Sequence, residues 1–310
     1  MSASDEELQL FTCRTNREKF VPKGRLNAMT TRTPFRVLRS CSRAYACTVY
    51  GKLENCNPTG SHKDRESEEI VRYAVREGIS DLAIASTGNA AISLAAYSYV
   101  HGLKCHVYLP VGIAPERLAQ IQAYHPSIKF APSYQRAIAV CEAAAEKWGY
   151  LNCNPGARHE KITGDAAIGR EIAMNGRSDY VVCPTNNGTL LAGVWWGLKK
   201  AGVKPRMVAA IARKTRLAAA IAGFHRIEEP ALSQTLKEAR GKVFEVSDSE
   251  ISEAARFMIS DGLVVEGAAA AGLACLRHLQ VTRNTKVCCV ITGTGLKFPA
   301  SLKQLLMKRP

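Results

Sequence analysis

The segment NPTGSHKDR, residues 57–65, holds a lysine whose amine could carry out covalent chemistry. A lysine amine forms a Schiff base with an aldehyde, including an aldehyde carried by a phosphorylated ring. A lone lysine in a turn is by default only a solvated charge. The interpretation of Lys63 as a catalytic residue therefore depends on whether the rest of the chain supplies a site for a phosphorylated ring.

Three further segments could supply that site, because each places a polar, glycine-containing turn directly after an apolar run. They contain Ser86, Thr87, Gly88 and Asn89; Asn186, Asn187, Gly188 and Thr189; and Thr292 with Gly293 and Gly295. Backbone N–H groups at the start of a helix favour a carboxylate or a phosphate. Each turn alone is also typical of ordinary capping, and none is a Walker or G-x-G-x-x-G motif. Their combination with Lys63 predicts a pyridoxal-phosphate site.

The turns follow short apolar runs that predict strands. These runs are DLAIAS (81–86), KCHVYLP (104–110), IKFAP (128–132), DYVVCPT (179–185), RMVAAIA (206–212), VFEVS (243–247) and KVCCVIT (286–292). Most are continuously apolar, which suits strands that are covered on both faces. In such sheets ligands bind beyond the carboxyl ends of the strands, which is where the polar turns lie.

Helix-like segments lie between the strand candidates. In residues 133–149 apolar residues recur at helical spacing, with Ser133 as the expected N-cap and Gly149 as the expected stop. The segment DAAIGREIAMNG is expected to end in a left-handed cap at Asn175-Gly176. Alternation of strand and helix predicts an α/β protein with doubly wound, mostly parallel sheets. We expect a larger domain of residues 1–75 and 155–310 and a smaller one of residues 76–154.

Composition narrows the class of protein. The formal net charge is +15, but Lys and Arg are spread along the chain. A solvated face, or attraction for anionic small molecules, explains this charge at least as well as nucleic acid does, and we expect no nucleic-acid partner. The eleven cysteines include no C-x-x-C pair, which predicts reduced core thiols and no metal site. Cys288 and Cys289 should point to opposite faces of a strand. Without a membrane-spanning run or a secretory leader, we expect a cytoplasmic protein.

The order of these motifs resembles the fold type II pyridoxal-phosphate enzymes, the family of tryptophan synthase β, threonine synthase and cysteine synthase. The resemblance extends from Thr33-Pro34 to Lys297. KLENCNPTGSHKDR is similar to the lysine motif of the family, STGNAA to its substrate-carboxylate loop, PTNNGTLLAG to its phosphate cup, and ITGTGLK to the segment that carries the partner of the pyridine nitrogen. The resemblance implies two doubly wound, mostly parallel three-layer domains with the cofactor in the cleft between them, the smaller domain being mobile.

The resemblance also implies a role for each site residue. Lys63 would form the Schiff base and then act as the general base at the substrate Cα. Thr292 would be a neutral partner of the pyridine nitrogen, which favours elimination over transamination. The cofactor phosphate would be held by Asn186, Asn187, Gly188 and Thr189. The substrate carboxylate would be held by Ser86, Thr87, Gly88 and Asn89, with Asn89 also beside the phenolic oxygen of the cofactor.

The motifs N-P-T-G-S-x-K-D-R and T-G-x-G-L-K look most like threonine synthase, which converts O-phosphohomoserine to threonine. The spacing in NPGARHEKITGDAAIGREI is closer to that of the serine/threonine dehydratases, and β-replacement of the cysteine synthase type is a further alternative. Dimers are usual in this family, so we expect a homodimer.

Two positions depart from the family pattern: His62 stands where an apolar residue is usual, and Asn186 and Asn187 stand where glycines are usual. A hypothesis from another class is a basic, non-catalytic binding protein that retains the fold. It predicts a colourless protein with salt-dependent binding.

Overall fold

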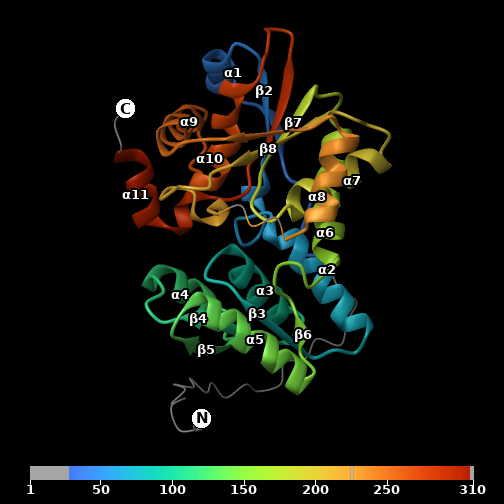
Figure 1. Cartoon of the computed structure of the whole chain (residues 1–310), viewed down its shortest axis with the longest axis vertical. Coiled ribbons are helices and arrows are strands. Elements are labelled where there is room, and N and C mark those ends of the chain that lie inside the picture. Colours follow the sequence, from blue (N-terminus) through green and yellow to red (C-terminus); the bar gives the residue numbers. More distant parts are fainter. Residues whose placement is uncertain (1–27, 224, 226, 308–310) are drawn as a thin grey trace. The chain divides into compact units, whose positions relative to one another are not determined.

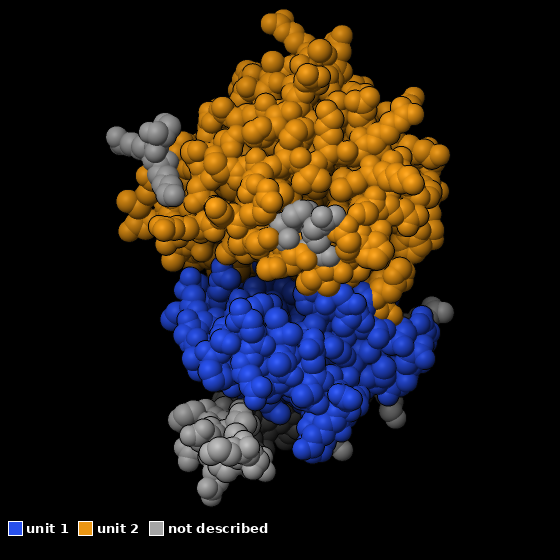
Figure 2. All heavy atoms as spheres, in the orientation of Figure 1, with its two compact units in different colours: residues 1–27, 70–158 blue, residues 28–69, 159–310 orange. Residues whose placement is uncertain are grey.

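The computed structural model describes residues 28–307 except 224 and 226. The chain forms two compact units, coloured separately in Figure 2: among the described residues, unit 1 comprises 70–158, and unit 2 comprises 28–69 and 159–307. The smaller domain expected from the sequence, 76–154, begins six residues later and ends four residues earlier than unit 1. Its mobility stays a prediction.

Unit 2 is built on a six-stranded sheet with the order β1-β2-β10-β7-β8-β9. Figure 1 labels β2, β7 and β8 of this sheet. Only β1 and β2 pair in antiparallel fashion, and the other neighbours are parallel. The strands are β1 (Phe35–Val37), β2 (Thr48–Lys52), β7 (Tyr180–Pro184), β8 (Arg206–Ile211), β9 (Lys242–Glu245) and β10 (Lys286–Val290). The last four match runs predicted from the sequence, whereas β1 and β2 were not predicted.

Helices cover both faces of this sheet, which makes unit 2 a three-layer structure. One face packs against α1 (Arg39–Tyr45), α9 (Asp248–Ser260), α10 (Gly267–Ala274) and α11 (Pro299–Met307), and the other against α6 (Glu160–Ala173), α7 (Thr189–Lys200) and α8 (Glu229–Glu238). Cys289 lies in the first core and Cys288 in the second, so the prediction that they point to opposite faces is confirmed. Short 3₁₀ helices complete the unit: η2 (Glu54–Cys56), η3 (Ala219–Ile221), η4 (Cys275–His278) and η5 (Gly295–Lys297).

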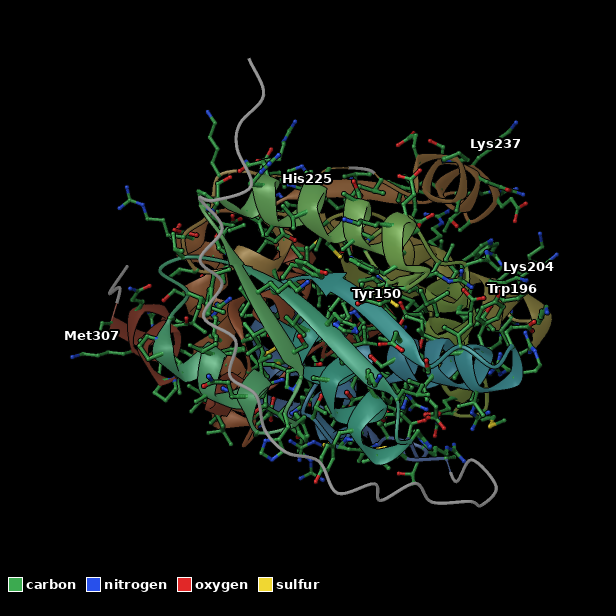
Figure 3. All side chains as sticks on the ribbon, turned by 90° about the horizontal axis from the view of Figure 1, so that it is seen from below. Tyr150, Trp196, Lys204, His225, Lys237 and Met307 are labelled. Atoms are coloured by element: carbon green, nitrogen blue, oxygen red, sulfur yellow. The ribbon has the colours of Figure 1, made fainter. Side chains whose placement is uncertain are left out.

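Unit 1 contains a four-stranded parallel sheet with the order β5-β4-β3-β6. Its strands are β3 (Asp81–Ala85), β4 (Lys104–Pro110), β5 (Ser127–Ala131) and β6 (Leu151–Asn152), and its helices are α3 (Asn89–Val100), α4 (Pro115–Gln122) and α5 (Tyr134–Trp148). Ala83 and Ala85 of β3 pack with α5. Tyr150, labelled in Figure 3, stacks on His106 of β4 with 4.1 Å between the ring centroids. The helix α2 (Lys63–Arg76) contributes residues to both units.

The predicted helix ends are partly right. Ser133 caps α5 by accepting from the backbone N–H of Arg136, and Gly149 ends it with φ +67°, both as expected. In contrast, α6 ends at Ala173, two residues before the predicted cap. The side chain of Asn175 bonds the carbonyl of Glu171, and only Gly176 has a left-handed φ. Among the described helices, none is both long and apolar enough to cross a membrane.

Candidate active site

Three neighbouring parallel strands of unit 2 end at the segments that the sequence singled out. The lysine segment follows β2, Thr292 and its glycines follow β10, and Asn186–Thr189 follow β7. In the ladder Val290 pairs with Lys52 and Cys289 with Val182, so β10 lies between the other two. Because the carboxyl ends of parallel strands meet at one edge of the sheet, these three segments share that edge.

The lysine segment and the segment after β10 are also bonded directly to each other. Ser61 and Gly293 form an antiparallel bridge, and the backbone N–H of His62 donates to the carbonyl of Thr292 at 2.9 Å. Gly60, with φ +81°, permits this approach, because a Cβ there would lie 2.8 Å from the Thr294 methyl group. Lys63, the first residue of α2, is therefore held one residue from this contact.

A buried ion network fixes the start of α2. Glu54 is completely buried and accepts from Arg65 Nε at 3.0 Å and from Asn57 Nδ2 at 2.6 Å. Arg65 Nη1 also reaches Glu171 of α6 at 2.8 Å, and Lys52 Nζ lies 2.6 Å from the same carboxylate. Burial raises the pKa of Glu54, but Arg65 and Lys52 outweigh it, so the pKa is lowered and the carboxylate stays charged. The network ties the lysine segment to α6.

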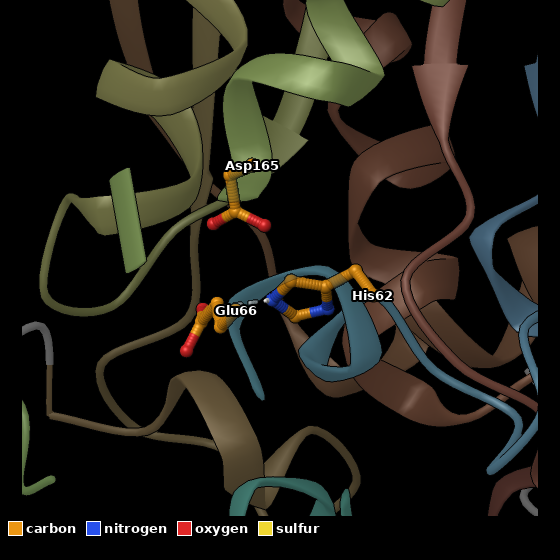
Figure 4. A group of neighbouring side chains, drawn as sticks. All are labelled: His62, Glu66 and Asp165. Atoms are coloured by element: carbon orange, nitrogen blue, oxygen red, sulfur yellow. Dashed lines mark ion pairs between the residues drawn. The ribbon is translucent and has the colours of Figure 1, made fainter. Parts of the chain in front are cut away.

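Lys63 points into a cluster of acidic groups. Its Nζ makes an ion pair with Glu66 one turn further along α2. His62 and Asp165 of α6 lie beside Glu66 (Figure 4). One ligand-type atom from each of His62, Glu66 and Asp165 lies within 4.8 Å of the others, and all three residues are buried. Sequence reasoning missed Glu66 and Asp165. The i,i+3 spacing of Lys63 and Glu66 was an available signal for the first.

Burial and charge set the protonation of this cluster. Burial lowers the pKa of His62 to about 4, and the charge of Lys63 adds to the effect, so His62 is neutral at pH 7. Burial alone would lower the pKa of Lys63, but the attraction of Glu66 and Glu266, and of Asp165 in its ionised form, outweighs it and raises the pKa. With no other group bonded to Nζ, Lys63 is thus a charged ammonium at neutral pH.

The turn before α7 has the features of an anion cradle. Gly188 is the N-cap with φ +97° and gives the helix no side-chain cap, so the first N–H groups of α7 point into the turn. The Thr189 hydroxyl is buried, and it has no hydrogen-bond partner among the residues that the structure describes. Asn187 Oδ1 accepts from the Thr189 N–H at 3.4 Å.

Asn186 uses its amide elsewhere. Its Nδ2 donates to the carbonyl of Ala220 at 3.3 Å, and its Oδ1 accepts from the N–H of His225 at 3.0 Å. The side chain of Asn186 therefore braces the segment after η3. Phosphate contact through this amide would require these bonds to break, so the backbone and Thr189 are the better donors.

Thr292 lies at the end of β10 and is buried. Its hydroxyl donates to Glu266 Oε1 at 3.2 Å, and its carbonyl accepts from His62. Gly293 allows Glu266 to come this close, because a Cβ there would lie 2.6 Å from the carboxylate. Glu266, which directly precedes α10, is a further site residue that sequence reasoning missed.

The segment Ser86–Asn89 lies in unit 1, where it follows β3 and ends at Asn89, the first residue of α3. Ser86 Oγ accepts from the Gly88 N–H at 3.3 Å, and Gly88 is the N-cap of α3 without a side-chain cap. A Cβ at Gly88 would meet no atom within 4 Å. The prediction of a polar turn that opens a helix is confirmed, and its role in binding a substrate stays a prediction.

Comparison with known proteins gives a consistent result. A family model described as pyridoxal-phosphate dependent enzyme matches residues 27–293. A threonine synthase from Halalkalibacterium halodurans is 31% identical over 294 residues, covering 86% of this chain and 83% of the relative. One from Bacillus sp. strain ULM1 is 32% identical over 307 residues, covering 88% and 85%.

Solved structures of similar fold have lower sequence identity. The processed form of threonine deaminase isoform 2 from Solanum lycopersicum superposes with a TM-score of 0.79 at 18% identity, covering 91% of this chain and 85% of that one. Maize serine racemase gives a TM-score of 0.79 at 18% identity, covering 89% and 92%. At this identity the likeness shows the fold alone, and the expected fold class is confirmed.

Proposed function

This chain belongs to the pyridoxal-phosphate dependent enzymes. We propose that it catalyses elimination or replacement at the β or γ carbon of an amino acid, and that its reaction is that of a threonine synthase. In that reaction O-phosphohomoserine and water give threonine and inorganic phosphate. The observation that carries the proposal is the bridge between Ser61 and Gly293, which holds Lys63 against the strand-end segment of Thr292. The identity of 31–32% with threonine synthases supports the choice of reaction.

The residues of unit 2 fit a phosphorylated aldehyde. Lys63 offers the amine, and the start of α7 offers a phosphate the backbone N–H groups that Asn187 does not bind. The Thr189 hydroxyl, which is buried without a partner in the described part of the chain, gains one if it donates to that phosphate. We propose that Asn187 and Gly188 complete the cradle and that Asn186 supports it from behind.

When bound, pyridoxal phosphate would supply an aldehyde for the substrate amine and a ring that delocalises negative charge at Cα. The side chains of this protein would do the rest. Lys63 Nζ would bond the aldehyde carbon at rest and, once displaced by the substrate, take the Cα proton. Thr292 would turn its neutral hydroxyl from Glu266 to the pyridine nitrogen, which favours departure of a leaving group. His62, neutral and buried, would form part of the wall.

We propose that the substrate carboxylate binds at Ser86, Thr87, Gly88 and Asn89, where the N–H groups at the start of α3 face a polar turn. Asn89 would also bond the phenolic oxygen of the cofactor. The smaller domain would move on substrate binding, as domain closure excludes water in many enzymes. Exchange of Asn89 for Ala should then raise KM for every amino acid tested.

We also propose a homodimer in the cytoplasm. The cysteines support a reducing compartment: none of the ten cysteines that the structure describes forms a disulfide, and nine of them are buried. Light scattering on a sizing column would test the dimer.

The substrate is tested with purified protein supplied with pyridoxal phosphate. O-phosphohomoserine should release phosphate and give an equal amount of threonine, and Lys63→Ala should give neither. Ketoacid from L-serine or L-threonine in place of this activity would identify a dehydratase. Consumption of an activated serine only when a nucleophile is added would identify a β-replacement enzyme. A protein that binds the cofactor but acts on none of these would contradict the proposed reaction class.

A further inference from the structure

Two carboxyl groups lie beside the amine of Lys63, and the reaction described above uses neither. Glu66 contacts Nζ directly, and Asp165 lies next to Glu66 within 4.8 Å (Figure 4). Glu66 retains 3% of its exposed surface and Asp165 none. Both Asp165 oxygens lack a hydrogen-bond partner among the described residues. A buried carboxyl group in this state requires an explanation.

Close packing of helices brings the two groups together. A Cβ at Gly164 would lie 2.2 Å from the backbone oxygen of Arg65, so α6 touches α2 directly before Glu66. A Cβ at Gly193 would lie 2.5 Å from the Cβ of Asp165, so α7 presses against the other side of Asp165. Three helices thus fix the separation of the carboxyl groups, and the pair is a built feature of the site.

Two carboxylates this close and this deeply buried cannot both be ionised, because like charges in a site of low dielectric repel strongly. The groups divide accordingly. Burial raises the pKa of Asp165 well above its usual range, and repulsion by Glu66 adds to this. Burial also acts on Glu66, but Lys63 and Lys161 outweigh it and lower its pKa. The pair therefore carries one proton, mainly on Asp165, and one negative charge, mainly on Glu66.

We propose that Glu66 and Asp165 form a singly protonated carboxyl pair that supplies one negative charge to Lys63 Nζ whenever this nitrogen carries a proton. The inference rests on the proposed function, in which Nζ is released as a neutral amine. The Cα proton then moves to Nζ, and the electron pair of the broken C–H bond stays on Cα. Positive charge develops on Nζ in this step, and the Glu66 carboxylate beside Nζ stabilises that charge. Glu66 is thus a positioning residue for the base.

Other titratable groups surround this amine, and they are the same in the parent protein and in the Glu66 variants. His62 lies 3.8 Å from Glu66 Oε1. Glu266 adds to the negative field at Nζ, Lys161 of α6 faces Glu66, and Glu54 faces both Asp165 and His62. A variant that removes only Glu66 therefore changes the charge nearest to Nζ and leaves this background in place.

Capture of the cofactor by stripped full-length protein measures the proton affinity of Nζ without any turnover. Only the neutral amine attacks the aldehyde carbon, forming a C=N bond and releasing one water, so the capture rate rises with pH up to the pKa of Nζ. Glu66→Gln should lower the midpoint of this profile by more than about one pH unit, which is roughly tenfold faster capture at pH 7. Its kcat should fall with little change in KM.

Asp165→Asn replaces one neutral group by another and should shift the midpoint by less than about half a unit. Glu66→Asp withdraws the carboxylate by one methylene and should shift the midpoint in the same direction as Glu66→Gln, but less far. This variant is the test if Glu66→Gln does not fold. Glu69→Gln, on the same helix, is the matched control and should leave the profile unchanged.

Three outcomes would overturn the inference: an unchanged profile in Glu66→Gln, an equal shift in Asp165→Asn, or a profile of the parent protein that moves when Mg²⁺ or Mn²⁺ is added, which would make the cluster a cation site. Failure of the parent protein to capture pyridoxal phosphate would instead contradict the proposed function.

Discussion

His62 is a buried imidazole that follows Ser61 directly and precedes the lysine, and its burial has a thermodynamic cost in acid. Its pKa is lowered to about 4, mainly by burial, against a value near 6.5 in an unfolded chain. The unfolded chain therefore binds a proton between these values that the folded chain does not. The share of the free energy of unfolding that depends on neutral His62 is fully present above about pH 6.5 and is lost as the pH falls toward 4.

His62→Phe should remove this acid-labile share of stability. The parent protein should lose up to about 3 kcal/mol more of its free energy of unfolding than the variant between pH 7 and pH 4, at about 1.4 kcal/mol per unit of pKa difference. Urea unfolding at several pH values measures the difference. Parallel curves for the two proteins would show that His62 is not buried in the neutral form.

The chemistry of single residues could be predicted only where the sequence itself marks it. Lys63 stands in a segment rich in turn formers, and Thr292 follows a strongly apolar strand, so both were found. Asp165 was not found, because its neighbours in the chain give no sign of a partner. Its significance arises when Gly164 lets α6 touch the backbone of Arg65, a contact between segments about 100 residues apart.

At the scale of elements, the strands with continuous apolar runs were predictable, and β1, β2 and β6 were not. The strands β3, β4, β7, β8 and β10 are buried runs, and burial on both faces leaves a strong signal in sequence. β1 has three residues and β6 has two, and β2 contains Gly51. These strands exist because a distant partner pairs with them. β2 matters most, since its ladder with β10 brings the lysine segment to Thr292.

Gly164→Ala tests whether the contact of α6 with α2 builds the site. The added methyl group would meet the Arg65 carbonyl at 2.2 Å, a backbone atom that cannot rotate away. We expect a loss of about 1–3 kcal/mol in the free energy of unfolding. We also expect weaker binding of the cofactor, because a shift of Arg65 would displace Lys63, two residues before it, and Glu66, the residue after it. Urea unfolding and a cofactor titration measure the two effects.

Gly202→Ala is the comparison, because a Cβ there meets no atom within 4 Å although φ is +75°. It isolates the cost of a left-handed backbone and should leave cofactor affinity unchanged. Equal cofactor affinity in Gly164→Ala and the parent protein would mean that the helix contact does not position Lys63.

At the scale of the whole molecule, the alternation of strands and helices predicted two α/β units, each with a mostly parallel sheet. It predicted the boundary between them only approximately. α2 contributes to both units, so the chain has no linker at this boundary whose composition would mark it. The net charge of +15 also gave no direct guide to function. Among the described residues, the charged groups that raise the pKa of the Lys63 amine are acidic, although the overall charge of the chain is positive.

The most direct test of the account is the chemical identity of the nitrogen that carries the cofactor. Protein loaded with pyridoxal phosphate is reduced with borohydride, digested and analysed by peptide mass. We predict the reduced cofactor on the peptide that contains Lys63 and on no other lysine, and its complete loss in Lys63→Arg. Cofactor fixed to a different lysine, or a fully loaded protein in which the Lys63 peptide is unmodified, would contradict the central claim.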